Sequence, residues 1–316
     1  MAHFGLQIPS FTYPGVPPER LFETVAGAAV AAEGAGFDSV WLMDHFHQIP
    51  GVGSQDEPIL EGYTLLAAIA ARTARVELGT MVTGVTYRNP AFLAKVVTTL
   101  DVVSSGRAIL GIGAAWFEDE HRAYGFDFPP VGERMDRLEE TIRICRAMFT
   151  QEQATVPGRH YAVDGARNVP APVRPGGPPI LVGGGGERRT LRIVAELADM
   201  SNLFGTQDTI RHKLDVLAGH CEAVGRDPAD IVKTRLGGLV VADSNEEAGR
   251  RFDEWVAGRG MSPEQVRRTT IVGTPDDAAA EVAAYLDLGL DGMMFNMPLV
   301  EDPDTVALAG ETLSRL

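Results

Sequence analysis

The feature of this sequence that most constrains its fold is a regular alternation of short apolar runs with longer segments of helical period. Such alternation is typical of repeated strand–helix units whose strands lie parallel in one sheet. The predicted strands are His3–Pro9, Ser39–Met43, Val76–Thr83, Ala108–Gly113, Ile180–Gly183, Met200–Phe204, Thr234–Val241 and Gly292–Asn296. Eight parallel strands are the number that closes a (β/α)8 TIM barrel, so an α/β barrel is the predicted fold.

Helices are predicted between these runs. They cover Pro18–Gly34, Leu65–Ala74, Pro90–Ser104, Arg134–Phe149, Arg188–Ala198, Asp208–Val224, Asn245–Ala257 and Pro275–Leu288. Pro90 stands at a helix start, and Gly36 and Gly289 follow helix ends, where these residue types are favoured. A barrel of this kind uses roughly 250 residues. The 316 residues therefore indicate a single barrel domain, 1–316, with insertions at the C-terminal face of the strands.

One connection, residues 151–179, is longer than the others and rich in proline and glycine. It cannot continue a helix, and we expect this loop insertion to cross the barrel mouth as an ordered segment. A domain boundary is the alternative. Neither half of the chain, however, has enough predicted strands to close a barrel by itself.

The charge and the cysteines exclude several classes of protein. The formal net charge of −15 argues against binding to nucleic acid or to an anionic membrane surface. Cys145 and Cys221 both lie in predicted helices, which argues against a disulfide framework. No secretory leader is visible, and no apolar run approaches the ~20 residues that span a bilayer. We therefore expect a soluble, cytoplasmic protein.

Four consecutive glycines, from 183 to 186, follow a predicted strand and precede a predicted helix. In that position, uncovered backbone N–H groups and the helix dipole can hold a phosphate. A plain flexible turn is the alternative. The neighbouring Arg188 and Arg189 favour the anion.

Asp44 and His45 stand at the end of the second predicted strand, where ligand sites of parallel barrels form. An imidazole can give or take a proton near neutral pH, and a carboxylate can accept a hydrogen bond from a ring N–H of a bound heterocycle. A loop-capping histidine is one alternative, and a metal site with His47 is another. A further group of polar residues is interpreted as solvated helix or loop positions: Asp101, Glu118, Asp119, Glu120 and His121.

The segment Gly111–Trp116 superficially imitates the fingerprint of dinucleotide-binding folds. Trp116 replaces the third glycine, and no strand ending in Asp or Glu follows at the required distance, so we reject a Rossmann site. The small residues Gly113 and Ala114 instead leave room for a planar ring against the barrel, with Trp116 lining the pocket. Tight packing of these small residues against a helix is the alternative.

Six segments occur in a fixed order along the chain: Phe4–Pro9, Trp41–Phe46, Leu78–Thr80, Tyr87–Pro90, Gly106–Trp116 and Gly183–Thr190. Together they resemble the luciferase-like monooxygenase superfamily, and within it the branch that uses the deazaflavin coenzyme F-420. The ordered set is specific, whereas each segment alone is not. The match runs from the first strand to the region after Asn202.

The resemblance implies that F-420 binds at the barrel mouth, with its phosphate at the glycine-rich turn. It also implies a bulge with a non-proline cis peptide near Met81-Val82, which presses on one face of the ring. The implied cofactor contacts are Asp44, Thr80, Met81, Val82, Thr83, Gly113, Ala114, Ala115, Gly183, Gly184, Gly185, Gly186 and Glu187. His45 is implied as the catalytic residue, a proton donor or orienting group. Gln7, Phe46 and Trp116 are the expected substrate contacts, and no metal is expected.

The resemblance also bears on the reaction. Relatives that oxidise sugar phosphates or alcohols with F-420 carry a catalytic glutamate near the position of Trp116, and this departure favours reduction of a small organic substrate by hydride transfer. An FMN-dependent monooxygenase that uses molecular oxygen is the alternative within the enzymes. A coenzyme-binding barrel without catalysis and an unrelated metal-dependent barrel are alternatives of other kinds. Because dimers are usual in the family, a homodimer is expected.

Overall fold

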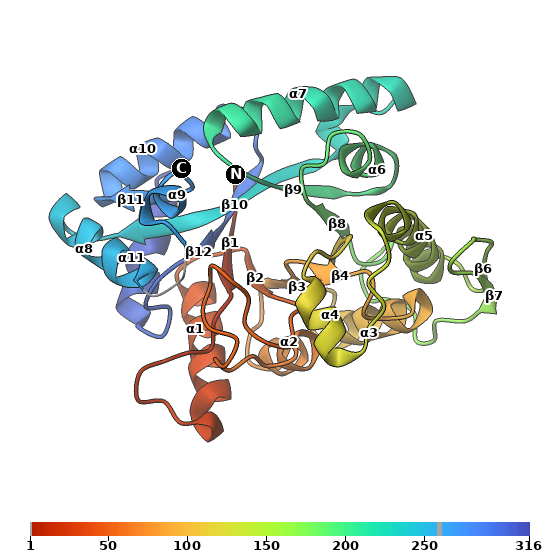
Figure 1. Ribbon diagram of the computed structural model, residues 1–316, viewed down its shortest axis with the longest axis horizontal. Helices are drawn as coiled ribbons and strands as arrows, with labels where there is room; N and C mark the ends of the chain where they lie inside the picture. Colours follow the sequence, from red (N-terminus) through yellow and green to blue (C-terminus); the bar gives the residue numbers. More distant parts are fainter. Residues whose placement is uncertain (1, 258–260) are drawn as a thin grey trace.

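The computed structural model, which describes residues 2–257 and 261–316, is a closed parallel barrel (Figure 1). Around the barrel the strands follow the order β1 (His3–Ile8), β2 (Ser39–Leu42), β3 (Glu77–Thr80), β5 (Ala108–Gly113), β8 (Ile180–Gly183), β9 (Met200–Phe204), β10 (Val232–Val241) and β12 (Gly292–Asn296). β12 pairs with β1 and closes the ring. Each of these strands overlaps a predicted one, so the predicted TIM barrel is confirmed.

Helices surround the barrel (Figure 1). They are η1 (Pro18–Arg20), α1 (Leu21–Gly34), α2 (Gly62–Ala70), α3 (Pro90–Val103), α4 (Glu118–Tyr124), α5 (Val131–Thr150), α6 (Thr190–Leu197), α7 (Gln207–Val224), η2 (Pro228–Asp230), α8 (Asn245–Val256), α9 (Pro263–Arg267), α10 (Pro275–Leu286) and α11 (Pro303–Leu313). Several begin with a proline after a capping side chain, as α3 does after Asn89. The sequence did not predict α4, α9 or α11. Within the described ranges, no helix has the length and apolar character to cross a membrane.

Two parts of the main sheet depart from the predicted pattern. The predicted strand 76–83 is divided into β3 and the short β4 (Thr83–Gly84), with the cis peptide Met81-Val82 between them. β11 (Thr270–Gly273) was not predicted, and it pairs with the end of β10 beyond the part that closes the barrel. The break after β3 is important because it shapes the barrel mouth.

Apolar side chains fill the interior of the barrel. The internal cluster consists of Trp41, Met81, Ile109, Leu181, Met200 and Met294. A much larger apolar core lies between the strands and the surrounding helices. Because the barrel is packed rather than hollow, space for a ligand remains only at its ends.

The insertion 151–179 does not cross the barrel mouth, so that prediction was wrong. It carries a small hairpin, β6 (Ala154–Val156) with β7 (Val163–Ala166), and then covers the opposite end of the barrel. Arg174 forms an ion pair with Glu77 at the start of β3, and Asp101 accepts hydrogen bonds from two backbone N–H groups of the insertion. The physical reason is that a helix returns the chain to the N-terminal ends of the strands, where the next strand begins.

Candidate active site

A cavity of about 510 Å³ opens at the C-terminal ends of the barrel strands. Its walls include most of the residues that the sequence predicted. These are Gln7, Asp44, His45, Met81, Val82, Thr83, Gly113, Ala114, Ala115, Trp116, Gly183, Gly184, Gly185 and Gly186. Strand ends that lie far apart in the sequence therefore meet in one cavity, as expected for a parallel barrel.

Three predicted site residues do not lie on this wall. Phe46 instead packs among the aromatic rings of Tyr87, Tyr124 and Phe126. Thr80 is buried behind the wall, with its hydroxyl 2.6 Å from that of Thr83. Glu187 accepts hydrogen bonds from two residues of α7, Lys213 at 2.6 Å and His212 at 3.0 Å. A position next to a strand end therefore does not decide which way a side chain points.

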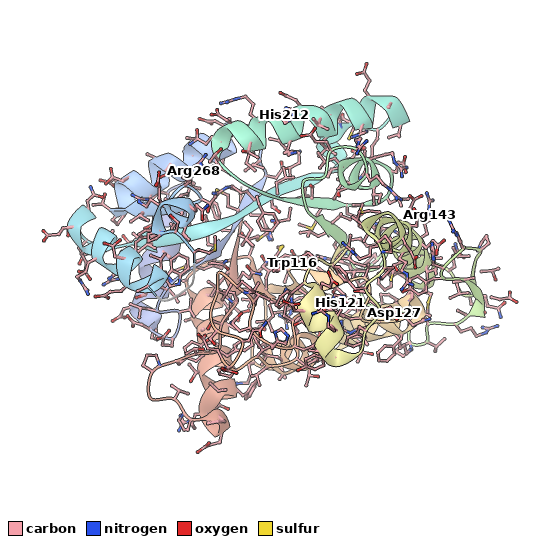
Figure 2. The ribbon with its side chains drawn as sticks, viewed as in Figure 1. Trp116, His121, Asp127, Arg143, His212 and Arg268 are labelled. Carbon is pink, nitrogen blue, oxygen red and sulfur yellow. The ribbon has the colours of Figure 1, made fainter. Side chains whose placement is uncertain are left out.

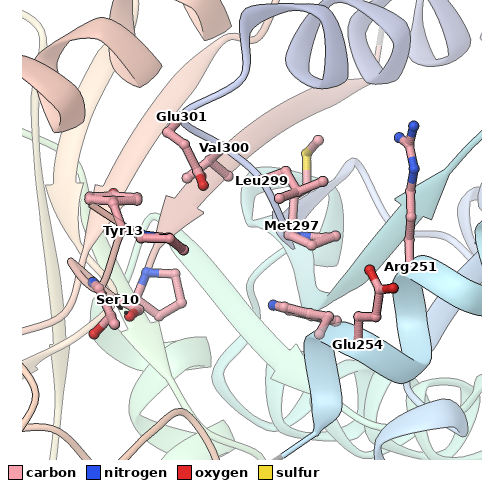
Figure 3. Close-up of a pocket in the computed structure, with 13 residues that line it drawn as sticks. Ser10, Tyr13, Arg251, Glu254, Met297, Leu299, Val300 and Glu301 are labelled. Atoms are coloured by element: carbon pink, nitrogen blue, oxygen red, sulfur yellow. Dashed lines mark hydrogen bonds between the residues drawn. The ribbon is translucent and has the colours of Figure 1, made fainter. Parts of the chain in front are cut away.

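A second hollow, of about 300 Å³, lies beside the first, where the ends of β1 and β12 face α8 (Figure 3). Its wall includes Ser10, Tyr13, Arg251, Glu254 and Leu299. Apart from Pro9, the two cavities share no lining residue among those described. The predicted site residues belong to the first cavity, which is the candidate active site.

The cis peptide Met81-Val82 occurs where the sequence predicted it. The Nε2 amide of Gln7 donates a hydrogen bond of 3.0 Å to the Met81 carbonyl. The Val82 side chain packs against glycines of β5 and β8, since a Cβ at Gly113 or Gly183 would lie 2.9 Å from a Val82 methyl group. These glycines therefore make room for the bulge itself.

Glu120 of α4 reaches from outside the barrel to the end of β2. Its Oε2 lies 2.9 Å from Nδ1 of His45, and the Tyr87 hydroxyl donates to the same oxygen. Oε1 accepts hydrogen bonds from the backbone N–H of Phe46 at 2.6 Å and of His47 at 3.3 Å. Burial opposes ionisation of this carboxyl, but the hydrogen bonds from His45 and Tyr87 outweigh it and lower the pKa of Glu120 to about 2.

The contact with Glu120 determines which nitrogen of the His45 ring carries a hydrogen. An ionised carboxylate can only accept hydrogen bonds, so Nδ1 of His45 must carry a hydrogen. In the neutral ring Nε2 is then the proton acceptor. Because His45 lines the cavity, it can exchange a proton with a ligand there.

The interpretation of Glu120 and His121 as solvated was wrong, because both side chains are fully buried, and so is Asp101. Glu118 and Asp119, on the other face of the same helix, are exposed as expected. The sequence did contain a signal for this helix. The run Glu118–Tyr124 follows a strand end and is closed by Gly125 in the left-handed conformation.

Asp44 is held by an ion pair and by the backbone of β4. Its Oδ2 accepts hydrogen bonds from Arg88 at 2.7 Å and from the Gly84 N–H at 3.1 Å, while Arg88 also binds Glu61 at 2.7 Å. Burial raises the pKa of Asp44, and Arg88 and Gly84 oppose that rise. Asp44 is thus a rigid part of the wall.

Three buried oxygens of cavity residues have no hydrogen-bond partner among the described residues: Gln7 Oε1, Asp44 Oδ1 and Asn296 Oδ1. Unpaired buried acceptors are costly, and a ligand with N–H or O–H groups can satisfy them. A deazaflavin ring, which carries such a donor, fits this set of acceptors. Across the described ranges, no group of three or more His, Cys, Asp or Glu side chains is arranged to hold a metal ion.

The glycine-rich turn also lines the cavity, and α6 begins four residues after Gly186. Gly184 has a φ of 120°, which only glycine adopts readily. Two of the nearby cations are already paired, Arg189 with Asp136 at 2.6 Å and Lys213 with Glu187 at 2.6 Å, while Arg188 is exposed and is not among the residues that line the cavity. A phosphate at this turn would therefore be held mainly by backbone N–H groups.

Comparisons with known proteins agree with this geometry. Residues 3–265 match the family model described as luciferase-like monooxygenase. An F420-dependent glucose-6-phosphate dehydrogenase of Amycolatopsis mediterranei is 30% identical over 302 residues, which cover 85% of this chain and 87% of the relative. The protein of the same name from Kineococcus radiotolerans is 31% identical over 299 residues, covering 87% of each chain.

Solved structures show the same fold. The monooxygenase RslO1 from Streptomyces bottropensis superposes with a TM-score of 0.82 at 23% identity, covering 99% of each chain. An F420-dependent secondary alcohol dehydrogenase in complex with an F420-acetone adduct also gives 0.82, at 19% identity, covering 99% of this chain and 98% of the other. The chain is therefore an enzyme of the luciferase-like monooxygenase family, similar over most of its length to the F420-dependent oxidoreductases in that family.

Proposed function

We propose that the protein binds F-420 at the barrel mouth and catalyses hydride transfer between this cofactor and a small organic substrate, in the direction that reduces the substrate. The observation that carries the proposal is the set of unpaired acceptors at Gln7, Asp44 and Asn296 beside the Met81-Val82 bulge. The relatives named as F420-dependent enzymes support the choice of cofactor.

In this proposal the cavity wall orients the cofactor ring. Asp44 would accept a hydrogen bond from it, and the segments Met81–Thr83 and Gly113–Ala115 would hold it between them. The turn Gly184–Gly186 binds the phosphate. Bound there, the reduced deazaflavin supplies the hydride. The residues of this chain supply position, exclusion of water and a proton.

His45 is the proposed proton donor to the substrate. Reduction of a C=C or C=O bond adds a hydride to one atom and a proton to the other, and His45 is the cavity residue able to give a proton near neutral pH. Glu120 Oε2, 2.9 Å from Nδ1 of His45, holds the ring in place for this transfer. Trp116 stands near the position of the glutamate expected in sugar-phosphate and alcohol dehydrogenases, which favours the reducing direction.

Equilibrium binding tests the cofactor. The purified protein is titrated separately with F-420 and with FMN, and the dissociation constants are measured by calorimetry. We expect F-420 to bind at least about tenfold more tightly, a difference of 1.4 kcal/mol. Tight FMN binding without affinity for F-420 would favour the FMN-dependent monooxygenase instead. Binding of F-420 with no turnover of any acceptor would favour the non-catalytic barrel.

The proposal includes a homodimer in the cytoplasm. Cys145 and Cys221 are both buried free thiols, which is compatible with a reducing compartment. Sedimentation velocity at micromolar concentration measures the oligomeric state, and a single monomeric species there would reject the dimer.

A further inference from the structure

Large apolar side chains gather around the opening of the active-site cavity. Trp116 is 57% exposed, Val131 is 62% exposed and Phe204 is 53% exposed, and all three line the same cavity. They come from three separate segments: the connection after β5, the first residue of α5 and the last residue of β9. Exposed apolar residues that converge on a concave site are typical of a surface that binds an apolar ligand.

Trp116 is held in a defined position. The preceding Ala115 has a φ of 60°, in the left-handed region that residues other than glycine seldom adopt. The indole stacks on Phe117, with centroids 5.1 Å apart and an angle of 24° between the rings. It also meets His45 edge-on at 5.9 Å. The ring is therefore an apolar surface next to the proposed proton donor, and it lies beside α4 at the barrel mouth (Figure 2).

The charges of the residues that line the cavity also favour an uncharged ligand. None of its described lining residues is Lys or Arg, and its ionisable groups are Asp44, His45 and Tyr87. A phosphate monoester carries close to two negative charges near neutral pH and is normally bound by arginine or lysine. With the Asp44 carboxylate in the wall and the glycine-rich turn assigned to the cofactor phosphate, the rest of this cavity offers an anionic substrate no counter-charge except a protonated His45.

We infer that the substrate is an uncharged molecule with a planar apolar part that stacks on Trp116 between Val131 and Phe204, and that phosphorylated sugars are not accepted. The inference deepens the proposed function and rests on it for the reaction. It gives this chain a substrate class that differs from glucose 6-phosphate, the substrate in the name of its relatives.

Binding without turnover tests the inference. The probes are 2-acetylnaphthalene, which is planar and uncharged, and glucose 6-phosphate. Each is titrated calorimetrically into the protein, alone and saturated with F-420. We expect measurable binding of the ketone in both states, weakened about tenfold by Trp116→Ala, since loss of aromatic contacts and of apolar area costs this much. Glucose 6-phosphate is expected to give no binding to the F-420-saturated protein, in which the cofactor phosphate occupies the glycine-rich turn, and no competition with the ketone there.

Two variants control the measurement. Phe92→Ala removes an aromatic ring that is 59% exposed on α3, outside the cavity, and should leave ketone binding unchanged. Trp116→Phe keeps an aromatic face and should retain most of the affinity. Melting temperatures of all variants are compared to establish that each is folded.

The outcomes separate the two claims. Ketone affinity that is unaffected by Trp116→Ala, or glucose 6-phosphate binding to the F-420-saturated protein as tight as that of the ketone, overturns the inference. If F-420 does not bind in a separate titration while ketone binding still depends on Trp116, the proposed function fails and the inferred specificity stands. The reverse result, F-420 binding with a preference for the phosphate, removes the inference alone.

Discussion

Glu120 Oε2 lies 2.9 Å from His45 Nδ1, and this contact joins a helix outside the barrel to the end of a barrel strand. The carboxylate is buried and also binds the backbone of the segment that follows His45. One side chain therefore orients the imidazole and ties it to the backbone that follows. In our account Glu120 is a positioning residue, because it acts through His45.

Replacing Glu120 tests this role. Glu120→Gln keeps the shape but removes the charge and presents an N–H group toward donors, so we expect kcat to fall by on the order of 10²-fold. KM and F-420 affinity should change much less.

Glu118→Gln is the matched control on the same helix. Glu118 is exposed and forms an ion pair with Arg122 at 3.4 Å, a surface pair of little energetic value. Its kcat should match that of the parent protein. A Glu120→Gln variant with the parent kcat and only a lower melting temperature would reduce Glu120 to a structural role.

His45→Ala should remove the proton donor and leave the walls of the cavity in place. We expect turnover to fall by about 10²-fold to 10⁴-fold, the range that general acid–base groups contribute. F-420 should still bind, as a titration of the variant can verify. Turnover equal to that of the parent with a good substrate would exclude His45 from the mechanism.

The lowered pKa of Glu120 predicts how stability depends on pH. Its folded value of about 2 lies below the ordinary value of 4.5, so the folded state binds this proton more weakly than the unfolded chain does. The stabilisation is complete above pH 4.5 and is lost as the pH falls from 4.5 toward 2. Melting temperatures of the parent and of Glu120→Gln should therefore converge over this interval. A difference that is constant from pH 7 to pH 3 would contradict the assignment.

Two glycine substitutions, one beside the bulge and one in α7, are expected to change the stability of the fold in opposite directions. A Cβ at Gly111 would lie 2.0 Å from the Thr80 carbonyl oxygen, so Gly111→Ala should destabilise the fold by about 1–3 kcal/mol or more. Gly219 lies in α7 with open space around it, and Gly219→Ala should stabilise by about 0.5–1 kcal/mol. Urea unfolding measures both. If the two substitutions changed the free energy of unfolding equally, the backbone at the end of β3 would move away from the added Cβ at little cost.

Periodicity in the sequence predicted the barrel, because each strand needed only an apolar run and a following helix. It also placed most of the cavity wall, since residues at the ends of parallel strands converge. It could not show that Glu120 turns inward, because that depends on packing between α4 and the β2 end. The prediction that Phe46 contacts the substrate was wrong for a related reason. The direction of its side chain is set by packing against Tyr87, Tyr124 and Phe126 rather than by its position in the chain.

An anaerobic single-turnover experiment tests most directly whether this protein reduces an organic substrate with F-420. The protein, loaded with reduced F-420, is mixed with an unsaturated ketone in the absence of oxygen, and reoxidation of the cofactor is followed by absorbance. We expect the cofactor to be reoxidised at a rate that depends on the ketone concentration and does not change when oxygen is added. One molecule of reduced product should form for each molecule of cofactor oxidised. Reoxidation that occurs only with oxygen, or product formation that requires reduced FMN instead, would contradict this expectation.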